Sequence, residues 1–379
     1  MREFDFLIIG GGIFGAYTAL YLAGKNYKIG LIEKEAELFS KASLVNQGRL
    51  HGGYHYPRSI PTALMAQEYK QRFTSDHQQF INASFENYYA IDKSASRTNS
   101  SQFEQFCKTV NIKALKVHQH PLFKSDQLEA LYLTEENSFD PREIAQFYIS
   151  KLEANKNIAI LLNTKIIQAE EVQQNWKVKF AFDDSPETQQ LKTPVVINAT
   201  YSGTNGINSI FGAEELDLMY EIAEIVLIDS PALRHTGLTV IDGPFASYIP
   251  YGNSGQISLT SVLHTHHKTA YSRLPEFDCQ QVNRECRPEL VSNCNLCLAK
   301  PISNQEKMIR QIKQYLNPGI SMQYIHSLFT LKAKLKSSLI DDARPTELVK
   351  RCDRPSFYSL FSGKINSIYE VEKILGKEF

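Results

Sequence analysis

Residues 4–33 read FDFLIIGGGIFGAYTALYLAGKNYKIGLIE, and this stretch decides the fold. An apolar run at 4–9 stops at consecutive glycines, an apolar helical pattern continues to Leu22, and a second apolar run at 29–32 closes on Glu33. The two runs have the length of buried strands, and the stretch between them has helical periodicity. The sequence therefore predicts a βαβ unit with parallel strands and a right-handed crossover.

Gly10, Gly12 and Gly15 have the spacing of a dinucleotide-binding turn between the first strand and the helix. One glycine permits a tight turn, one lets the backbone approach a pyrophosphate, and one lets helix and strand pack closely. The helix N-terminus then offers unpaired N–H groups and a partial positive charge to the phosphates. Glu33 is placed to accept hydrogen bonds from ribose hydroxyls. These residues predict a Rossmann-type dinucleotide site.

The rest of the chain shows shorter and less regular patterns. Neither an internal repeat nor a low-complexity linker is visible, so we expect interleaved domains. Helices are expected over 61–80, 100–109, 141–151, 304–316 and 366–376, and strands within 158–182, 195–197, 221–263 and 325–333.

The composition bounds the class of protein. The 379 residues are enough for about two domains, and 42% hydrophobic with 22% charged residues is typical of a globular protein. Lys plus Arg equals Asp plus Glu at 41 each, so we expect no nucleic-acid partner. We see no signal-peptide pattern and no run of roughly 20 apolar residues, and therefore expect a cytoplasmic protein without a transmembrane segment.

Residues 42–53, ASLVNQGRLHGG, carry a family resemblance. Together with the glycine motif, this stretch resembles the D-amino-acid-oxidase-like (DAO) superfamily of FAD-dependent oxidoreductases. It is most similar to the L-2-hydroxyglutarate dehydrogenase and glycerol-3-phosphate dehydrogenase relatives. The similarity continues at Asp140-Pro141, at 343–346 and at 362–365, whereas the strand end at 198–201 reads Asn-Ala-Thr-Tyr in place of the usual Asn-Ala-Ala-Gly.

The resemblance implies an FAD cofactor and a fold of mixed α/β and α+β class. In this fold a Rossmann-type FAD-binding domain is interleaved with a substrate domain built on a mixed or antiparallel β-sheet. We expect a discontinuous FAD-binding domain over 1–80, 141–215 and 330–379. The substrate domain would then take 81–140 and 216–329, with a Cys-rich insertion at 279–297.

The glycine motif and the resemblance together imply the residues that contact FAD. In the family the segment after the acidic residue wraps the pyrophosphate and passes the flavin ring, which places Arg49 to His51 near the isoalloxazine. The expected cofactor contacts are Gly10, Gly12, Ile13, Phe14, Gly15, Glu33, Lys34, Ser43, Asn46, Gln47, Gly48, Arg49, Leu50, His51, Ile166, Ala199, Gly363, Lys364 and Ile365.

Two histidines, His51 and His55, are the candidates for the chemistry at the flavin. Oxidation of an alcohol needs a base for the hydroxyl proton, and histidine suits that role near neutral pH. Two alternatives stay open: the histidines only hydrogen-bond the flavin or the backbone, or His51 carries a covalent flavin link.

Three further side chains are candidates for the substrate. Arg58 and Arg344 could bind a carboxylate through the guanidinium fork, or form structural ion pairs. Tyr248 could face the pocket, or pack in a strand. Lys364, expected beside the flavin, could stabilise the negative charge of the reduced ring, or be an exposed lysine at a helix start.

These residues lead to a hypothesis and two alternatives for function. The leading hypothesis is oxidation of a small 2-hydroxy acid or amino acid by hydride transfer to FAD. The alternatives are an amine oxidase of the glycine or sarcosine oxidase type, and a catalytically silent flavin-binding interaction subunit. The sequence indicates a small-molecule substrate, but neither the electron acceptor nor the oligomeric state.

Four of the six cysteines are clustered at Cys279, Cys286, Cys294 and Cys297. Four thiolates can close a tetrahedral zinc site, and the last pair has the spacing of a zinc knuckle, although the first pair is wider than usual. Structural zinc, an iron–sulfur cluster and free or redox-active thiols all stay open.

Overall fold

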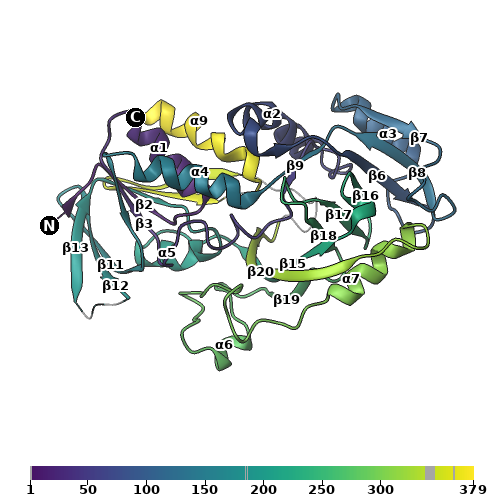
Figure 1. Ribbon diagram of the computed structural model, residues 1–379. Coiled ribbons are helices and arrows are strands. Elements are labelled where there is room, and N and C mark those ends of the chain that lie inside the picture. The colour runs from purple at the N-terminus through teal and green to yellow at the C-terminus, as the bar shows by residue number, and fades with distance from the viewer. Residues whose placement is uncertain (1, 184, 186, 338–345, 362) are drawn as a thin grey trace.

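The computed structural model describes residues 2–183, 185, 187–337, 346–361 and 363–379. Two large β-sheets lie side by side along the long axis of the molecule, and helices cover them (Figure 1). The helices are α1 (Ile13–Ala23), α2 (Ile60–Asp76), α3 (Ser100–Thr109), α4 (Pro141–Glu153), α5 (Thr204–Ile210), α6 (Cys279–Val282), α7 (Gln305–Ile312) and α9 (Glu370–Glu378).

The first large sheet has six strands and contains the predicted βαβ unit. β2 pairs in parallel with β3 on one side and with β14 on the other, as the glycine motif predicts. The order is β10 (Ile158–Leu161), β3 (Ile29–Ile32), β2 (Phe6–Ile9), β14 (Val195–Asn198), β22 (Ser356–Phe361) and β21 (Glu347–Asp353).

Both faces of this sheet are buried, because its apolar strands are covered on both sides. Along β2, Phe6 and Ile8 pack in the cluster that contains residues of α1, α4 and α9, whereas Leu7 and Ile9 face the other way. The opposite cluster contains Trp176 and residues of a four-stranded sheet. That sheet has the order β1 (Arg2–Glu3), β13 (Thr188–Thr193), β12 (Asn175–Phe182) and β11 (Thr164–Val172).

The second large sheet has nine strands, most of them antiparallel, with β6 and β16 paired in parallel. Tyr89 on β6 packs with Phe103 of α3, and Tyr88 on the other face packs in the cluster that contains Met308 of α7. The order is β19 (His266–Ala270), β15 (Leu218–Asp229), β18 (Ile257–Ser261), β17 (Ala246–Pro250), β16 (Thr236–Ile241), β6 (Glu86–Asp92), β8 (Leu128–Thr134) and β7 (Ala114–Val117), while β20 (Gln323–Leu335) pairs with the free side of β15.

A small three-stranded sheet lies between the two large sheets. Its order is β4 (Arg49–Leu50), β9 (Asn137–Phe139) and β5 (Ile81–Asn82). Arg49 is paired with Ser138 in this sheet, so the segment that carries His51 is fixed against residues far along the chain.

The architecture confirms the predicted fold class of a Rossmann-type sheet with an interleaved mixed sheet. The two large sheets draw on alternating stretches of sequence, but β20 begins before residue 330 and ends after it, and belongs wholly to the nine-stranded sheet. The division into FAD-binding and substrate domains stays a proposal. No helix among the residues that the model describes is long and apolar enough to cross a membrane.

Candidate active site

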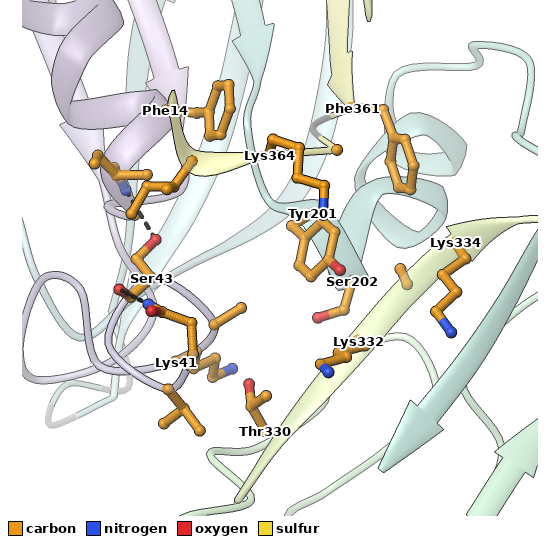
Figure 2. Close-up of a pocket in the computed structure, with 18 of the residues that line it drawn as sticks. Phe14, Lys41, Ser43, Tyr201, Ser202, Thr330, Lys332, Lys334, Phe361 and Lys364 are labelled. Atoms are coloured by element: carbon orange, nitrogen blue, oxygen red, sulfur yellow. Dashed lines mark hydrogen bonds between the residues drawn. The ribbon is translucent and has the colours of Figure 1, made fainter. Parts of the chain in front are cut away.

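A large cavity of about 1340 Å³ opens between the two large sheets. Small-molecule pockets usually hold about 300–1,000 Å³, so this cavity has room for a dinucleotide together with a small substrate. Its walls include the start of α1, the segment 39–49, the turn after β14, and the ends of β20 and β22. Figure 2 shows Phe14, Lys41, Ser43, Tyr201, Lys332 and Lys364 around this space.

The glycine turn has the tight geometry that a dinucleotide cradle requires. A Cβ on Gly15 would lie 1.9 Å from the carbonyl oxygen of Gly10, and a Cβ on Gly12 would lie 2.8 Å from Oγ of Ser43. Gly10 has a φ of +109°, which only glycine adopts readily. Ile13 N donates a hydrogen bond of 3.0 Å to Ser43 Oγ, which fixes the following loop on the helix N-terminus. The residues present fit an FAD pyrophosphate.

Glu33 lies at the end of β3, on the cavity wall. Its Oε2 accepts a hydrogen bond of 2.7 Å from Gly11 N, and its Oε1 accepts one of 3.0 Å from Glu35 N. These bonds hold the carboxylate beside the glycine turn, at the distance along the chain that a ribose partner requires.

At another part of the cavity wall, Arg49 forms a buried ion pair with Glu136. Arg49 Nη1 lies 2.7 Å from Glu136 Oε2, and the two side chains are 1% and 0% exposed. Glu136 also accepts hydrogen bonds from Tyr89 OH at 2.6 Å and from Gly52 N at 2.9 Å. Arg49 Nε and Nη2 are buried, and neither finds a hydrogen-bond partner among the described residues.

His51 and Lys364 line the cavity with Arg49. Burial, together with the charges of Lys364, His55 and Arg49, holds the pKa of His51 well below its ordinary value. Burial and the charge of Arg49 likewise lower the pKa of Lys364 to about 7. The Lys364 ammonium lies 4.5 Å from the centre of the Tyr56 ring. The lowered pKa favours the neutral imidazole form of His51, whose Nδ1 lies 3.9 Å from Glu136 Oε1.

Arg58 and His55 lie at the rim of the cavity, both with exposed side chains. Arg58 Nε donates to Asp242 Oδ1 at 2.7 Å, so its charge already has a partner. The His55 ring centre lies 5.9 Å from that of His51. Arg344, the other arginine expected to bind a carboxylate, lies outside the described residues.

The cavity contains most of the predicted cofactor residues, but not all of them. Gly15, Gly48 and Leu50 do not line it. Gly15 packs against the turn, Gly48 has a φ of +67° and packs against Phe139, and Leu50 lies fully in the core.

The prediction that Tyr248 could face the pocket is wrong. Tyr248 is fully buried in the core of the nine-stranded sheet, where its hydroxyl lies 2.9 Å from Thr236 Oγ1. The sequence reasoning instead missed Lys332 and Lys334 of β20, which line the cavity, and Glu136, which orients Arg49. The alternation of Lys332 and Lys334 along β20 was a sequence signal that both side chains lie on one face of the strand. The sequence around Glu136 gave no indication that it contacts Arg49.

The structure does not support the predicted zinc site. Among the described residues, no group of three or more His, Cys, Asp or Glu side chains is arranged to hold a metal ion. The thiols instead pack with apolar residues, and burial raises the pKa of Cys294 to about 12 and also raises that of Cys279.

Comparison with known proteins agrees with this geometry. The model of the family "DAO: FAD dependent oxidoreductase" matches residues 5–255. An FAD-dependent monooxygenase, FPY4, of Fusarium mangiferae is 24% identical over 366 residues, which cover 96% of this chain and 87% of that protein. The mitochondrial L-2-hydroxyglutarate dehydrogenase of Caenorhabditis briggsae is 42% identical over 67 residues, which cover 17% of this chain and 15% of that protein.

Solved structures share the fold over nearly the whole chain. Glycine oxidase from Geobacillus kaustophilus has a TM-score of 0.72 at 12% identity, covering 97% of this chain and 91% of its own. L-α-glycerophosphate oxidase from Mycoplasma pneumoniae, with FAD bound, has a TM-score of 0.72 at 15% identity, covering 98% and 94%. The expected resemblance is confirmed, and with it an FAD-dependent enzyme rather than a catalytically silent subunit. The chain belongs to the DAO family of FAD-dependent oxidoreductases.

Proposed function

We propose that this enzyme oxidises a small 2-hydroxy acid, or an amino acid, at the carbon next to the carboxylate. The observation that carries the proposal is the Arg49 side chain, whose Nε and Nη2 are buried on the cavity wall without a partner among the described residues. A buried, half-paired guanidinium costs free energy unless an anion completes it. A substrate carboxylate supplies that anion.

The predicted cofactor residues define the proposed orientation of FAD. The backbone at Gly12 and Ile13 would bind the pyrophosphate, and Glu33 the ribose of the adenosine half. The flavin ring would then lie toward Arg49, His51 and Lys364. When bound, FAD supplies the acceptor for the substrate hydride.

The proposed substrate site uses two cations for one carboxylate. Arg49 would donate from Nε and Nη2, because Nη1 is already bonded to Glu136. Lys364 shares the cavity wall, where burial and, second to it, the charge of Arg49 lower the lysine pKa to about 7. An anion between the two side chains would relieve the repulsion between these charges and favour the charged lysine.

His51 is the proposed acceptor of the substrate hydroxyl proton. Its Nδ1 is buried without a hydrogen-bond partner in the described chain, and its pKa lies well below the ordinary value. A neutral imidazole can take the proton as the hydride leaves the neighbouring carbon. The similarity to L-2-hydroxyglutarate dehydrogenase, although short, supports a hydroxy acid over an amino acid.

The test is anaerobic mixing of the purified flavoprotein with candidate substrates. We expect a 2-hydroxy acid such as L-2-hydroxyglutarate or lactate to bleach the flavin absorbance near 450 nm (an ordinary flavin band), and the matching alcohol without a carboxylate to leave it unchanged. Glycine and sarcosine test the amine alternative in the same assay. Reduction by neutral alcohols as fast as by hydroxy acids would contradict the role given to Arg49.

A further inference from the structure

Residues 271–303 form a long excursion between β19 and α7, which we call the Cys strap. Figure 1 shows it as a loop that carries α6 and projects beside α5 and the ends of β19 and β20. Within the strap, the only helix that the model describes is α6, and the four clustered cysteines all lie here. Arg273, Leu274 and 289–291 belong to the wall of the large cavity.

The Cys strap is bonded to the loop that follows β3. The carbonyl oxygen of Val291 accepts hydrogen bonds from the ammonium groups of both Lys34 and Lys41, the latter at 2.8 Å. Asn293 is 7% exposed, and its Nδ2 donates to the carbonyl oxygen of Ser40 at 2.9 Å. These bonds join the strap to the residues immediately after Glu33.

The strap also packs on α5. A Cβ on Gly206 would lie 2.8 Å from the carbonyl oxygen of Glu289, so this helix and the strap are in close contact. Asn205 Nδ2 donates to the carbonyl oxygen of Arg273 at 2.9 Å. The strap therefore bridges the β3 loop and α5, which flank the same part of the cavity.

The four cysteines of the strap are partly buried. Cys286 Sγ accepts a hydrogen bond of 3.3 Å from Ser292 N, and Cys297 Sγ accepts one of 3.3 Å from Asn283 Nδ2. Cys279, Cys286 and Cys294 pack against the apolar cluster that contains Val291. The thiols thus hold the outgoing and returning halves of the strap together, which fixes the position of Val291.

We propose that the Cys strap is the outer wall of the adenosine half of the cofactor site and clamps bound FAD in place. This inference rests on the proposed orientation of FAD, with its ribose at Glu33. Glu33, Lys34, Ile166 and Val291 line the same cavity, and Lys34, the residue after Glu33, is bonded to Val291, so an adenosine at Glu33 would lie against the strap. FAD leaves only when the contacts of Val291 and Asn293 open.

The first experiment measures FAD release from the holoenzyme after dilution, by the rise in flavin fluorescence. Asn293→Ala removes one buried hydrogen bond between the strap and the β3 loop, and we expect release about tenfold faster. Gln281→Ala is the matched control, since Gln281 is an exposed strap residue, and its release rate should equal that of the unaltered enzyme. An unchanged rate in Asn293→Ala overturns the clamp.

A second measurement needs no variant and decides the matter if Asn293→Ala does not fold. The full chain freed of flavin is labelled with a maleimide, and the labelling of the peptide that contains Cys294 is followed by mass spectrometry. We expect ADP to slow this labelling at least fivefold and riboflavin to leave it unchanged. Equal labelling with and without ADP overturns the proposal. Neither experiment involves substrate oxidation. If both give the expected result but no hydroxy acid reduces the flavin, only the proposed function is contradicted.

Discussion

Two buried carboxylates of the same enzyme have different surroundings. Glu224 on β15 is 0% exposed and accepts hydrogen bonds from His267 Nε2 at 2.8 Å, from Asn304 N at 2.9 Å and from Ser303. Glu136 is also 0% exposed and well bonded, but its partner Arg49 keeps two buried donors without a partner among the described residues.

The difference separates a structural charge from a functional one. A buried charge that is fully hydrogen-bonded fixes its neighbours, and Glu224 fixes β19 through His267 and the start of α7 through Asn304. A buried charge with unpaired donors needs a further partner, and we propose that the substrate carboxylate is this partner for Arg49. Removing the first cluster should therefore cost stability, and removing the second should cost activity.

The largest expected effect is that of His51→Asn. With a 2-hydroxy acid, loss of the proton acceptor should lower the rate of flavin reduction by about 10²–10⁴-fold, measured by anaerobic stopped-flow absorbance. His55→Asn, on the exposed neighbour, is the control and should lose less than about threefold. If the flavin of His51→Asn is reduced as fast as that of the unaltered enzyme, the substrate needs no base, and the result favours the amine oxidase alternative.

Glu224→Gln should break the structural cluster without touching the chemistry. The neutral amide leaves His267 and Asn304 with a weaker partner, and we expect unfolding in urea to show a loss of about 3 kcal/mol. The rate of flavin reduction in the folded protein should change less than about twofold. A stable variant would show that this network adds little to the fold.

The same carboxylate gives an acid dependence. Burial alone would raise the pKa of Glu224, but hydrogen bonds from His267, Ser303 and Asn304 outweigh burial and lower it. Its contribution to stability is therefore complete above the unfolded carboxyl pKa of about 4.3 and is lost as pH falls through the lower folded pKa. Urea unfolding from pH 6 to 3 should show a smaller acid loss in Glu224→Gln than in the unaltered enzyme.

Arg49→Lys tests the half-paired guanidinium itself. Lysine keeps the charge but loses the fork, so kcat/KM for a hydroxy acid should fall about 30-fold, or about 2 kcal/mol. Arg58→Lys is the control, because the Arg58 side chain is 40% exposed at the rim and its charge already pairs with Asp242. Equal losses of kcat/KM in the two variants would show that Arg49 on the cavity wall is no more important for the substrate than Arg58 at the rim.

The smallest expected effect is a pH dependence of substrate capture. Burial and Arg49 lower the pKa of Lys364 to about 7, so its ammonium is lost as pH rises through that value. If the charged form binds the carboxylate, kcat/KM should be about tenfold lower at pH 8 than at pH 6. Lys364→Met should have lower kcat/KM and no such step, and a persistent step would assign it to another group.

The sequence predicted the local parts of this fold well, because their signals are local. The glycine spacing at 10–15 and the flanking apolar runs define β2, α1 and β3 without reference to other residues. Helix α3 at Ser100–Thr109 was also predicted to the residue. The strands β6 and β8 were missed, although both are apolar, because their pairing with β16 and with each other is set by distant partners.

The sequence predicted the loop residues of the site but not the residues that contact them. His51 and Arg49 were found from the motif they belong to, but the ion pair with Glu136 joins residues 87 positions apart. The expectation for Tyr248 was wrong because the sequence does not show which face of its strand points to the core. Tyr248 points to the core, where its hydroxyl is bonded to Thr236. The cysteine spacing suggested a metal, and only the three-dimensional packing showed thiols in an apolar cluster.

The strand order of the six-stranded sheet has a consequence for how the protein is made. β14 lies between β2 and β22, so the strand that leads into the glycine turn shares its sheet with Ser356–Phe361. During synthesis, the six-stranded sheet that contains β2 can therefore be completed only after β22 has left the ribosome. We therefore expect the cavity to be complete only after the C-terminal part has been made, because Gly363, Lys364 and Ile365 line it.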